Sequence, residues 1–373
     1  MNKKSTILQI NVTSALGGGP EHMFSLIKGL SRDKYNIVAV CPKDGPYFKM
    51  LNELGAQVID IPVRKLSLKV LFDIIGVVRK NKVDLIHAHG KGAGLYGRVA
   101  GALTGVPVIF TFHGIHYKAY GIFLRFSYLL IERILSFFTA WVINVSKGEL
   151  KKGISLGTIN RRKSSVIYNG IDMNRLEARK WGKAVSRTDF GFKDGDIITG
   201  SVARFNVQKG HEYLIQAFSK IAAERPGAKL LLVGDGELLS EMKNTVAKLG
   251  IEGRVVFTGY REDAIEIIRV MDIYALASLW EGMPISLLEA MGCGKPVVAT
   301  DVIGNNEIVV DRDTGFLVPK GDAGMLAEKI INLIDNIELR NMMGEKGKEK
   351  VKREFSAGDM ISKTAAVYER VLS

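Results

Sequence analysis

Cysteines and long apolar runs are scarce in this sequence. Only Cys41 and Cys293 occur among its 373 residues, which excludes a disulfide framework and favours a reducing cytoplasm. No run approaches the roughly 18 apolar residues that a membrane-spanning helix requires. In the opening segment MNKKSTILQINV, Gln9 and Asn11 interrupt the apolar part, so we expect a first strand rather than a signal peptide. These absences together predict a cytoplasmic protein.

Negative charge is scarce in the first half of the chain. The net charge is +13, and residues 1–200 contain 30 Lys+Arg against 14 Asp+Glu, whereas residues 201–373 contain 22 against 25. Two halves so different in charge indicate two domains with different neighbours. No nucleic-acid module is recognisable and no aromatics interleave with the basic runs, so we expect no nucleic-acid partner and favour an anionic membrane surface. Charge scattered over a soluble surface is the alternative to peripheral attachment at the inner face of the cell membrane.

Short runs rich in Val and Ile alternate with helical periods along the whole chain. One series of strands runs from STILQINV to SVIYNG and a second from DIITGSVAR to TGFLVP, and helical stretches separate most of them. This alternation predicts an α/β protein of two doubly wound parallel-sheet domains that face a cleft. We expect the domains over residues 1–175 and 176–356. Two helical stretches, near 337–353 and 357–372, end the chain with no strand after them.

The segment WEGMPISLLEAMGCGKPVVA holds two carboxylates, Glu281 and Glu289, eight positions apart. Pro284 suits the first helical position, and Ile285 and Glu289 then lie on one helical face. An anion held by the first-turn amides would lie one turn from Glu289, with Glu281 on the loop beside it. A sugar nucleotide fits this arrangement, and an amphipathic helix with two solvated glutamates fits it equally.

Polar residues follow other strands of the second series. Arg204 and Lys209 lie on the loop after DIITGSVAR, where a guanidinium fork and an ammonium can jointly neutralise a diphosphate without a metal. Gly234 ends the strand LLLV, and Tyr260 and Arg261 follow VVFTG, where a nucleobase could lie. Plain turns are the alternative for both of these loops.

In the first half, the loop TSALGGGP brings Gly18 and Gly19 to the end of the first strand, where amides can approach a phosphate or a sugar. His113 ends the strand IFTF and is a candidate either as a donor to a sugar hydroxyl or as a backbone anchor. We expect His87 and His89 to point to opposite faces of their strand, which argues against a shared metal and favours structural hydrogen bonds.

Several other features have ordinary explanations. His22 and His116 indicate little, and Asp311-Arg312-Asp313 is better explained as a turn than as a metal-binding motif. The segment YKAYGIFLRFSYLLIERILSFFTAW could lay an apolar face on a membrane, but we favour a core helix of the first domain.

With these residues identified, the chain resembles the retaining glycosyltransferases of family 4, which have the GT-B fold, over essentially its full length. The most specific part is EGMPISLLEAMGCGKPVVAT, which matches the family's E-x7-E block, and SVARFNVQKG, LLLVGDGE, VFTGY and NNEIVVDRDTGFLV support it. The resemblance implies that Glu289 binds the ribose hydroxyls and that Glu281 approaches the donor hexose. It implies that Arg204 and Lys209 hold the diphosphate.

The resemblance also implies further contacts. The donor-binding backbone would be that of Gly282, Met283, Pro284, Ile285 and Ser286. Gly18, Gly19 and His113 would face the transferred sugar. The last helix, residues 357–373, would pack back on the first domain. The family's Gly-Pro pair before the glutamate matching Glu307 is replaced by Gly304-Asn305-Asn306, which puts contacts of that loop in doubt.

The function that follows is transfer of a hexose-type sugar from a nucleoside diphosphate sugar, with uridine expected on family grounds, to an acceptor hydroxyl. Arg204, Lys209, Glu281 and His113 would form the catalytic set, with retained anomeric configuration and with no metal or cofactor. The acceptor would be a glycan or a lipid-linked glycan of a bacterial envelope, capsule or exopolysaccharide. A GT-B sugar-nucleotide epimerase and a non-catalytic sugar-nucleotide-binding assembly protein are the alternatives.

Overall fold

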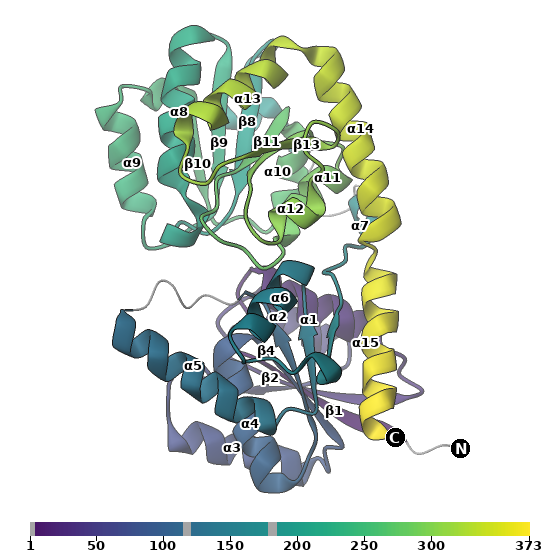
Figure 1. Cartoon of the computed structure of the whole chain (residues 1–373). Helices are drawn as coiled ribbons and strands as arrows, with labels where there is room; N and C mark the ends of the chain where they lie inside the picture. Colours follow the sequence, from purple (N-terminus) through teal and green to yellow (C-terminus); the bar gives the residue numbers. More distant parts are fainter. Residues whose placement is uncertain (1–3, 115–120, 178–184) are drawn as a thin grey trace. The chain divides into compact units, whose positions relative to one another are not determined.

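Parallel strands alternate with helices in both halves of the computed structural model (Figure 1), which describes residues 4–114, 121–177 and 185–373. The chain divides into two units. Unit 1 comprises residues 1–170 and 357–373, and unit 2 comprises residues 171–356. The expected fold class, two doubly wound parallel-sheet domains, is confirmed.

Unit 1 contains a seven-stranded sheet whose paired strands are all parallel, in the order β3-β2-β1-β4-β5-β6-β7. Its central strands are apolar runs because helices bury both of their faces. The strands are β1 (Ser5–Asn11), β2 (Tyr35–Cys41), β3 (Gln57–Asp60), β4 (Leu85–His89), β5 (Val108–Phe112), β6 (Trp141–Asn144) and β7 (Ser164–Val166).

Helices cover both faces of this sheet. One hydrophobic cluster joins it to α3, α4 and parts of α5 and α6, and another joins it to α1, α2 and α15. The helices are α1 (Gly18–Gly29), α2 (Pro46–Glu53), α3 (Leu68–Lys80), α4 (Gly90–Thr104), α5 (Ile122–Phe137), α6 (Lys147–Ser155) and α15 (Ala357–Leu372), with a 3-10 turn η1 (Arg161–Lys163). α15 buries Met360, Val367 and Tyr368 against unit 1. The chain therefore returns to its first unit at its end.

The expectation that residues 117–141 form a core helix is wrong. Most large apolar side chains of α5 are exposed, and only Glu132 and Leu135 of this helix are buried. His116, Tyr117 and Lys118 lie outside the described residues. In the part of the chain that is described, no helix is long and apolar enough to cross a bilayer.

Unit 2 contains a parallel six-stranded sheet in the order β10-β9-β8-β11-β12-β13. Its strands are β8 (Ile197–Val202), β9 (Ala228–Val233), β10 (Val255–Gly259), β11 (Ile273–Leu276), β12 (Val297–Thr300) and β13 (Gly315–Val318). Its helices are α7 (Met173–Glu177), α8 (His211–Glu224), α9 (Leu239–Lys248), α10 (Ala264–Val270), α11 (Ile285–Gly292), α12 (Asn305–Ile308), α13 (Ala323–Asp335) and α14 (Ile337–Glu354), with 3-10 turns η2 (Arg187–Phe190), η3 (Val207–Lys209) and η4 (Glu252–Arg254).

Each sheet reverses its strand order at one place. In unit 1 this switch point lies between β1 and β4, and in unit 2 it lies between β8 and β11. Ligands of open parallel sheets bind beyond the carboxyl ends of the strands at such a point. The loops that follow these four strands are therefore where functional side chains should gather.

Candidate active site

The loops after β8 and β11 are held together at the switch point of unit 2. The Leu279 amide donates to the Gln208 carbonyl at 2.8 Å, and the Asn206 side chain accepts from the Lys209 amide at 3.2 Å. Gly210 has a positive φ of 59°, and a Cβ there would lie 2.2 Å from the Ala277 carbonyl oxygen. Only glycine allows this close approach, so the turn carrying Lys209 is fixed against the end of β11.

Lys209 and Glu281 form an ion pair in these loops. The ammonium lies 2.5 Å from one carboxylate oxygen, and the Ser278 hydroxyl donates to the same oxygen at 2.6 Å. Gln208 donates to the other oxygen at 3.2 Å. Glu281 is buried, with 7% of its surface exposed. The sequence suggested separate tasks for these two residues, but the structure brings them together as one buried unit.

Arg204 follows β8 and is exposed. Within the described ranges its guanidinium makes no hydrogen bond or ion pair, so its donors are available to an anion. The backbone beneath it is rigid, because Gly234 has a φ of 137° and a Cβ there would lie 2.1 Å from the Ala203 carbonyl oxygen. The loop after β9 therefore supports the loop that carries Arg204.

The N-terminus of α11 adjoins this pair in sequence. Pro284 is the N-cap, with an extended ψ of 120°, and the helix begins at Ile285, one residue later than expected. No side chain caps this end among the residues that are described, and the first amides of any helix lack intrahelical acceptors. The amides of Ile285 and Ser286 can therefore donate to an anion.

Tyr274 connects this helix end to the switch point, and nothing in the sequence pointed to it. Its hydroxyl lies 2.9 Å from the Ser286 hydroxyl and 3.1 Å from the Val202 carbonyl oxygen. Burial raises the pKa of this phenol, so it remains a neutral hydrogen-bonding group. Its position on β11, next to β8, is visible only in the folded sheet.

The loop after β12 packs against Gly282. Gly304 has a φ of 90°, and a Cβ there would lie 2.3 Å from the Gly282 carbonyl oxygen. Asn305 is buried and donates to the Thr300 carbonyl at 3.0 Å. The Asn305 side chain thus stabilises the loop after β12, and Gly304 of this loop packs against Gly282.

The remaining candidates of unit 2 differ in their surroundings. Glu289 is half-buried on α11, one turn after Ile285. Tyr260 is exposed at the end of β10, two strands from β8, and Arg261 is held there by Asp263 at 2.5 and 2.7 Å. This carboxylate raises the pKa of Arg261. Arg261 is therefore committed to a local partner, unlike Arg204.

Asp311 to Asp313 form a turn, as the sequence suggested. Asp311 accepts from the Leu317 amide at 2.9 Å, and Asp313 pairs with Lys346 at 2.6 Å. Both carboxylates therefore already have partners within unit 2.

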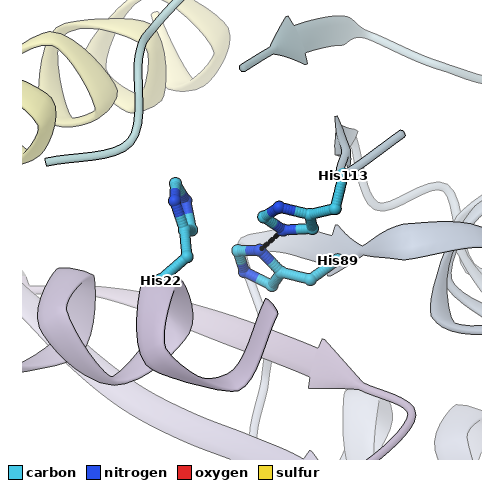
Figure 2. Close-up of side chains that lie close together, drawn as sticks. All are labelled: His22, His89 and His113. Carbon is cyan, nitrogen blue, oxygen red and sulfur yellow. Dashed lines mark hydrogen bonds between the residues drawn. The ribbon is translucent and has the colours of Figure 1, made fainter. Parts of the chain in front are cut away.

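In unit 1, three histidines meet beside the start of α1 (Figure 2). Gly18 and Gly19 form the first turn of α1 rather than a loop, and a Cβ on Gly19 would lie 3.9 Å from the His113 ring. His113 Nε2 lies 3.5 Å from His89 Nδ1, and the rings of His113 and His22 have centroids 5.0 Å apart. His22 lies three residues after Gly19 on the same face of the helix, a spacing that could have drawn attention to it.

The prediction that His87 and His89 point to opposite faces is wrong. Their ring centroids are 4.1 Å apart. Side chains alternate with a period of two along a strand, so residues two positions apart share a face. His87 nevertheless has a structural role, because its ring nitrogens lie 2.6 Å from the Tyr368 hydroxyl and 2.7 Å from the Thr111 hydroxyl.

Amide side chains orient this cluster. Asn169 Oδ1 lies 2.9 Å from His22 Nδ1, and Gln9 Oε1 lies 2.8 Å from His89 Nε2. Burial lowers the pKa of His22 to about 4 and that of His89 and His113 well below the usual range. All three imidazoles are therefore neutral at pH 7. Amide oxygens accept from His22 and His89, and His89 accepts from His113, so His22 Nε2 and His113 Nδ1 are left as acceptors for a hydroxyl.

Neutral, oriented imidazoles are also the form that binds metal ions. The ligand atoms of His22, His89 and His113 all lie within 4.8 Å of one another. These three residues could hold a metal ion, and the absence of a metal stays a prediction from the sequence. Their existing contacts also suit a metal-free sugar-binding surface, since His113 and His89 bond to each other directly.

Two family profiles match the chain. The profile described as "Glycosyltransferase Family 4" matches residues 16–175, and the one described as "Glycosyl transferases group 1" matches residues 183–350. Together they span most of both units.

The chain is also similar to proteins that are named as glycosyltransferases. The chain is 27% identical to the UDP-Gal:alpha-D-GlcNAc-diphosphoundecaprenol alpha-1,3-galactosyltransferase of Escherichia coli, over 98% of this chain and 97% of the relative. It is 30% identical to the uncharacterized glycosyltransferase MJ1178 of Methanocaldococcus jannaschii, over 95% of each. It is 28% identical to the capsular polysaccharide biosynthesis glycosyltransferase CapM of Staphylococcus aureus, over 91% and 92%.

A solved structure supports the same fold. Anabaena Alr3699/HepE, crystallised with UDP and glucose, superposes with a TM-score of 0.85 at 22% identity, over 98% of this chain and 100% of that one.

Proposed function

The chain belongs to the family 4 glycosyltransferases of GT-B fold, and on that premise we propose that it transfers a sugar from a UDP-sugar to an acceptor hydroxyl with retention of anomeric configuration. The observation that carries the proposal is the switch point of unit 2. There the exposed Arg204, the Lys209–Glu281 pair and the uncapped start of α11 follow two adjacent strands.

These groups suit a departing diphosphate. Arg204 can form a bidentate contact with phosphate oxygens, and Lys209 supplies a point charge that Glu281 holds in position. The amides at the start of α11 add donors whose orientation does not change during the reaction. Negative charge that develops on the leaving group is thereby stabilised without a metal ion. We propose that Glu289 binds the ribose and that Tyr260 lies near the base.

The sugar-facing part is proposed to lie in unit 1. His113 is neutral and uses its N–H on His89, so its other ring nitrogen would accept from a hydroxyl of the transferred sugar rather than donate to it. Gly18 and Gly19 would allow close approach of the backbone. We place no side chain as a nucleophile. The acceptor is proposed to attack from the face that the diphosphate leaves, with a phosphate oxygen accepting its proton.

For the acceptor we propose a lipid-linked glycan used in assembly of an envelope polysaccharide. The Escherichia coli relative is named for a diphosphoundecaprenol-linked sugar, and the Staphylococcus aureus relative for capsular polysaccharide. Their similarity over nearly the full chain supports this class of acceptor.

A donor screen tests the proposal. Purified protein is incubated with a panel of sugar nucleotides and a lipid-linked acceptor, and UDP release and the anomer of the product are measured, with and without a chelator. We expect UDP release with an α-linked product, unaffected by the chelator. Arg204→Ala should reduce kcat/KM by about 100-fold, because one transition-state donor is lost.

Arg312→Ala is the matched control, since Arg312 is an exposed arginine of the same unit with 82% of its side chain accessible. It should retain full activity. An inverted product would contradict retention, and activity abolished by the chelator would contradict metal independence. Isomerised donor with no transfer would indicate an epimerase instead.

A further inference from the structure

Helix α5 is attached to unit 1 by a polar contact. Arg98 of α4 forms a two-pronged ion pair with Glu132, at 2.9 and 3.1 Å, and both side chains are buried. The Arg98 guanidinium also lies over the Phe110 ring, 4.2 Å from its centroid. The one acidic residue of α5 therefore faces the protein interior, the reverse of an ordinary surface helix.

The outward side of α5 is apolar. Phe123, Phe126 and Phe137 are 86%, 70% and 84% exposed. Among the described residues, nine of the twenty exposed large hydrophobic side chains lie between Ile122 and Phe138, and we call these nine the α5 apolar face. Such a concentration on a soluble surface marks an interaction site. Phe72 on α3 and Leu103 on α4 add exposed apolar surface to the same layer of helices.

Positive charge is concentrated in the same part of unit 1. Residues 61–170, which carry α3 to α6, contain 17 Lys+Arg against 4 Asp+Glu, whereas the rest of unit 1 contains 9 against 7. The end of α6 touches α5, because Arg133 donates to the Leu156 carbonyl at 2.9 Å. Arg161, Arg162 and Lys163 follow shortly after it, and all are exposed.

We propose that the α5 apolar face inserts into the interface of an anionic bilayer, with the surrounding lysines and arginines on the lipid headgroups. A helix of 16 residues is about 24 Å long, and it would lie in the membrane plane rather than cross it. The apolar face supplies insertion and the basic residues supply attraction, the two signals that stable peripheral binding requires. The proposal deepens the proposed function, since unit 1 would then meet a lipid-linked acceptor at the membrane surface.

Vesicle co-sedimentation tests it. The full chain is mixed with vesicles of phosphatidylcholine containing phosphatidylglycerol, and with phosphatidylcholine alone, at low and high salt. Binding is expected to the anionic vesicles at low salt and to weaken as salt rises. The double variant Phe123→Ser/Phe137→Ser should bind at least about 100-fold more weakly, because two rings no longer leave water. Ile337→Ser, which removes an exposed side chain of unit 2, should bind like the parent.

Several results would overturn docking. The parent could fail to bind anionic vesicles at low salt, or the double variant could bind as tightly as the parent. A parent dimer that the double variant converts to a monomer, without vesicle binding by either, would assign the face to a second copy of the chain. Thermal unfolding midpoints equal to the parent's show that the variants fold.

Activity is followed separately, as UDP release with a soluble acceptor. A protein that is active but does not bind vesicles would contradict membrane docking and would leave the proposed function in place. An inactive protein that binds vesicles through Phe123 and Phe137 contradicts the proposed function and leaves docking in place.

Discussion

At the scale of single residues, the Lys209–Glu281 pair sets the electrostatics of unit 2. A lone lysine in this loop would be mobile and fully charged. The buried carboxylate instead holds the ammonium in one place. Ser278 and Gln208 also donate to the carboxylate, so both of its oxygens have hydrogen-bond partners in these loops. Arg204, which has no such partner among the described residues, remains the more available cation.

A double-mutant cycle measures this coupling. Lys209→Met and Glu281→Gln should each destabilise unit 2 by about 1–3 kcal/mol, because each leaves a partner buried and unpaired. The double variant should lose less than the sum, with a coupling energy of about 1–2 kcal/mol in urea unfolding.

The exposed pair of Lys346 and Asp313 provides the control, since both side chains are about half accessible. Its cycle should give a coupling energy below about 1 kcal/mol. Equal coupling energies for the two pairs would contradict a special role for Glu281.

At the scale of elements, α15 is the last helix of the chain and yet part of the interior of unit 1. α15 packs closely against α1 at Gly29, where a Cβ would lie 2.2 Å from the Ile361 side chain. Tyr368 reaches through to the sheet, where its hydroxyl lies 2.8 Å from Gln9 Nε2 and 2.6 Å from His87 Nδ1. The helix thus supports, through Gln9, the histidine cluster near His113.

Removal of this single hydroxyl should be costly. Tyr368→Phe leaves Gln9 Nε2 and His87 Nδ1 without a buried partner, so the free energy of unfolding of unit 1 should fall by about 1–3 kcal/mol. Chemical denaturation of the full chain measures it. Lys363→Ala on the exposed side of α15 is the control and should change stability by no more than about 0.5 kcal/mol. Equal stability of the Tyr368→Phe and parent proteins would show that α15 does not support the cluster.

At the scale of the whole molecule, the two units differ in charge and in histidine content. Unit 1 carries 26 Lys+Arg against 11 Asp+Glu, and unit 2 carries 26 against 28. Five of the six histidines belong to unit 1, and His211 is the single histidine of unit 2. Burial lowers the pKa of His211 to about 3 and that of His22 to about 4, and it lowers the pKa of His87, His89 and His113 well below the usual range.

Lowering the pH should therefore reduce the folding stability of unit 1 more than that of unit 2. A buried histidine whose pKa is lowered in the folded state contributes its full stabilisation to the folded state above about pH 6.5. This contribution is lost as the pH falls toward the folded-state pKa, because the histidine of the unfolded chain binds a proton first. His211 alone should cost unit 2 about 2 kcal/mol between pH 7 and pH 5, and four such histidines should cost unit 1 more.

Hydrogen exchange followed by mass spectrometry at pH 7 and pH 5, corrected for the intrinsic exchange rate, separates the two units. Peptides of the unit 1 sheet should lose more protection than those of β8 to β13. Larger losses in unit 2 would contradict the assignment of buried neutral histidines. His211→Gln should remove most of the pH dependence of unit 2.

Local sequence patterns were sufficient to predict the fold class and several residues of the candidate site. Alternation of Val- and Ile-rich runs with helical periods indicated two doubly wound sheets, because that pattern is local and repeated. Glu281, Glu289, Arg204 and Lys209 were identified from spacing and strand ends, since the carboxyl ends of parallel strands meet at one edge of a sheet. These signals need only a few consecutive residues.

Pairing and exposure were decided by the tertiary structure. The Lys209–Glu281 bond depends on β8 and β11 being neighbours, although 72 positions separate the two residues. Whether α5 is buried depends on which helix covers it, and the periodicity of YLLIERIL does not contain that information. The membership of His22 in the histidine cluster depends on where α1 lies relative to β4 and β5. Such contacts join residues that are far apart in the sequence. A local sequence pattern therefore contains no information about them, and they become visible only in the folded structure.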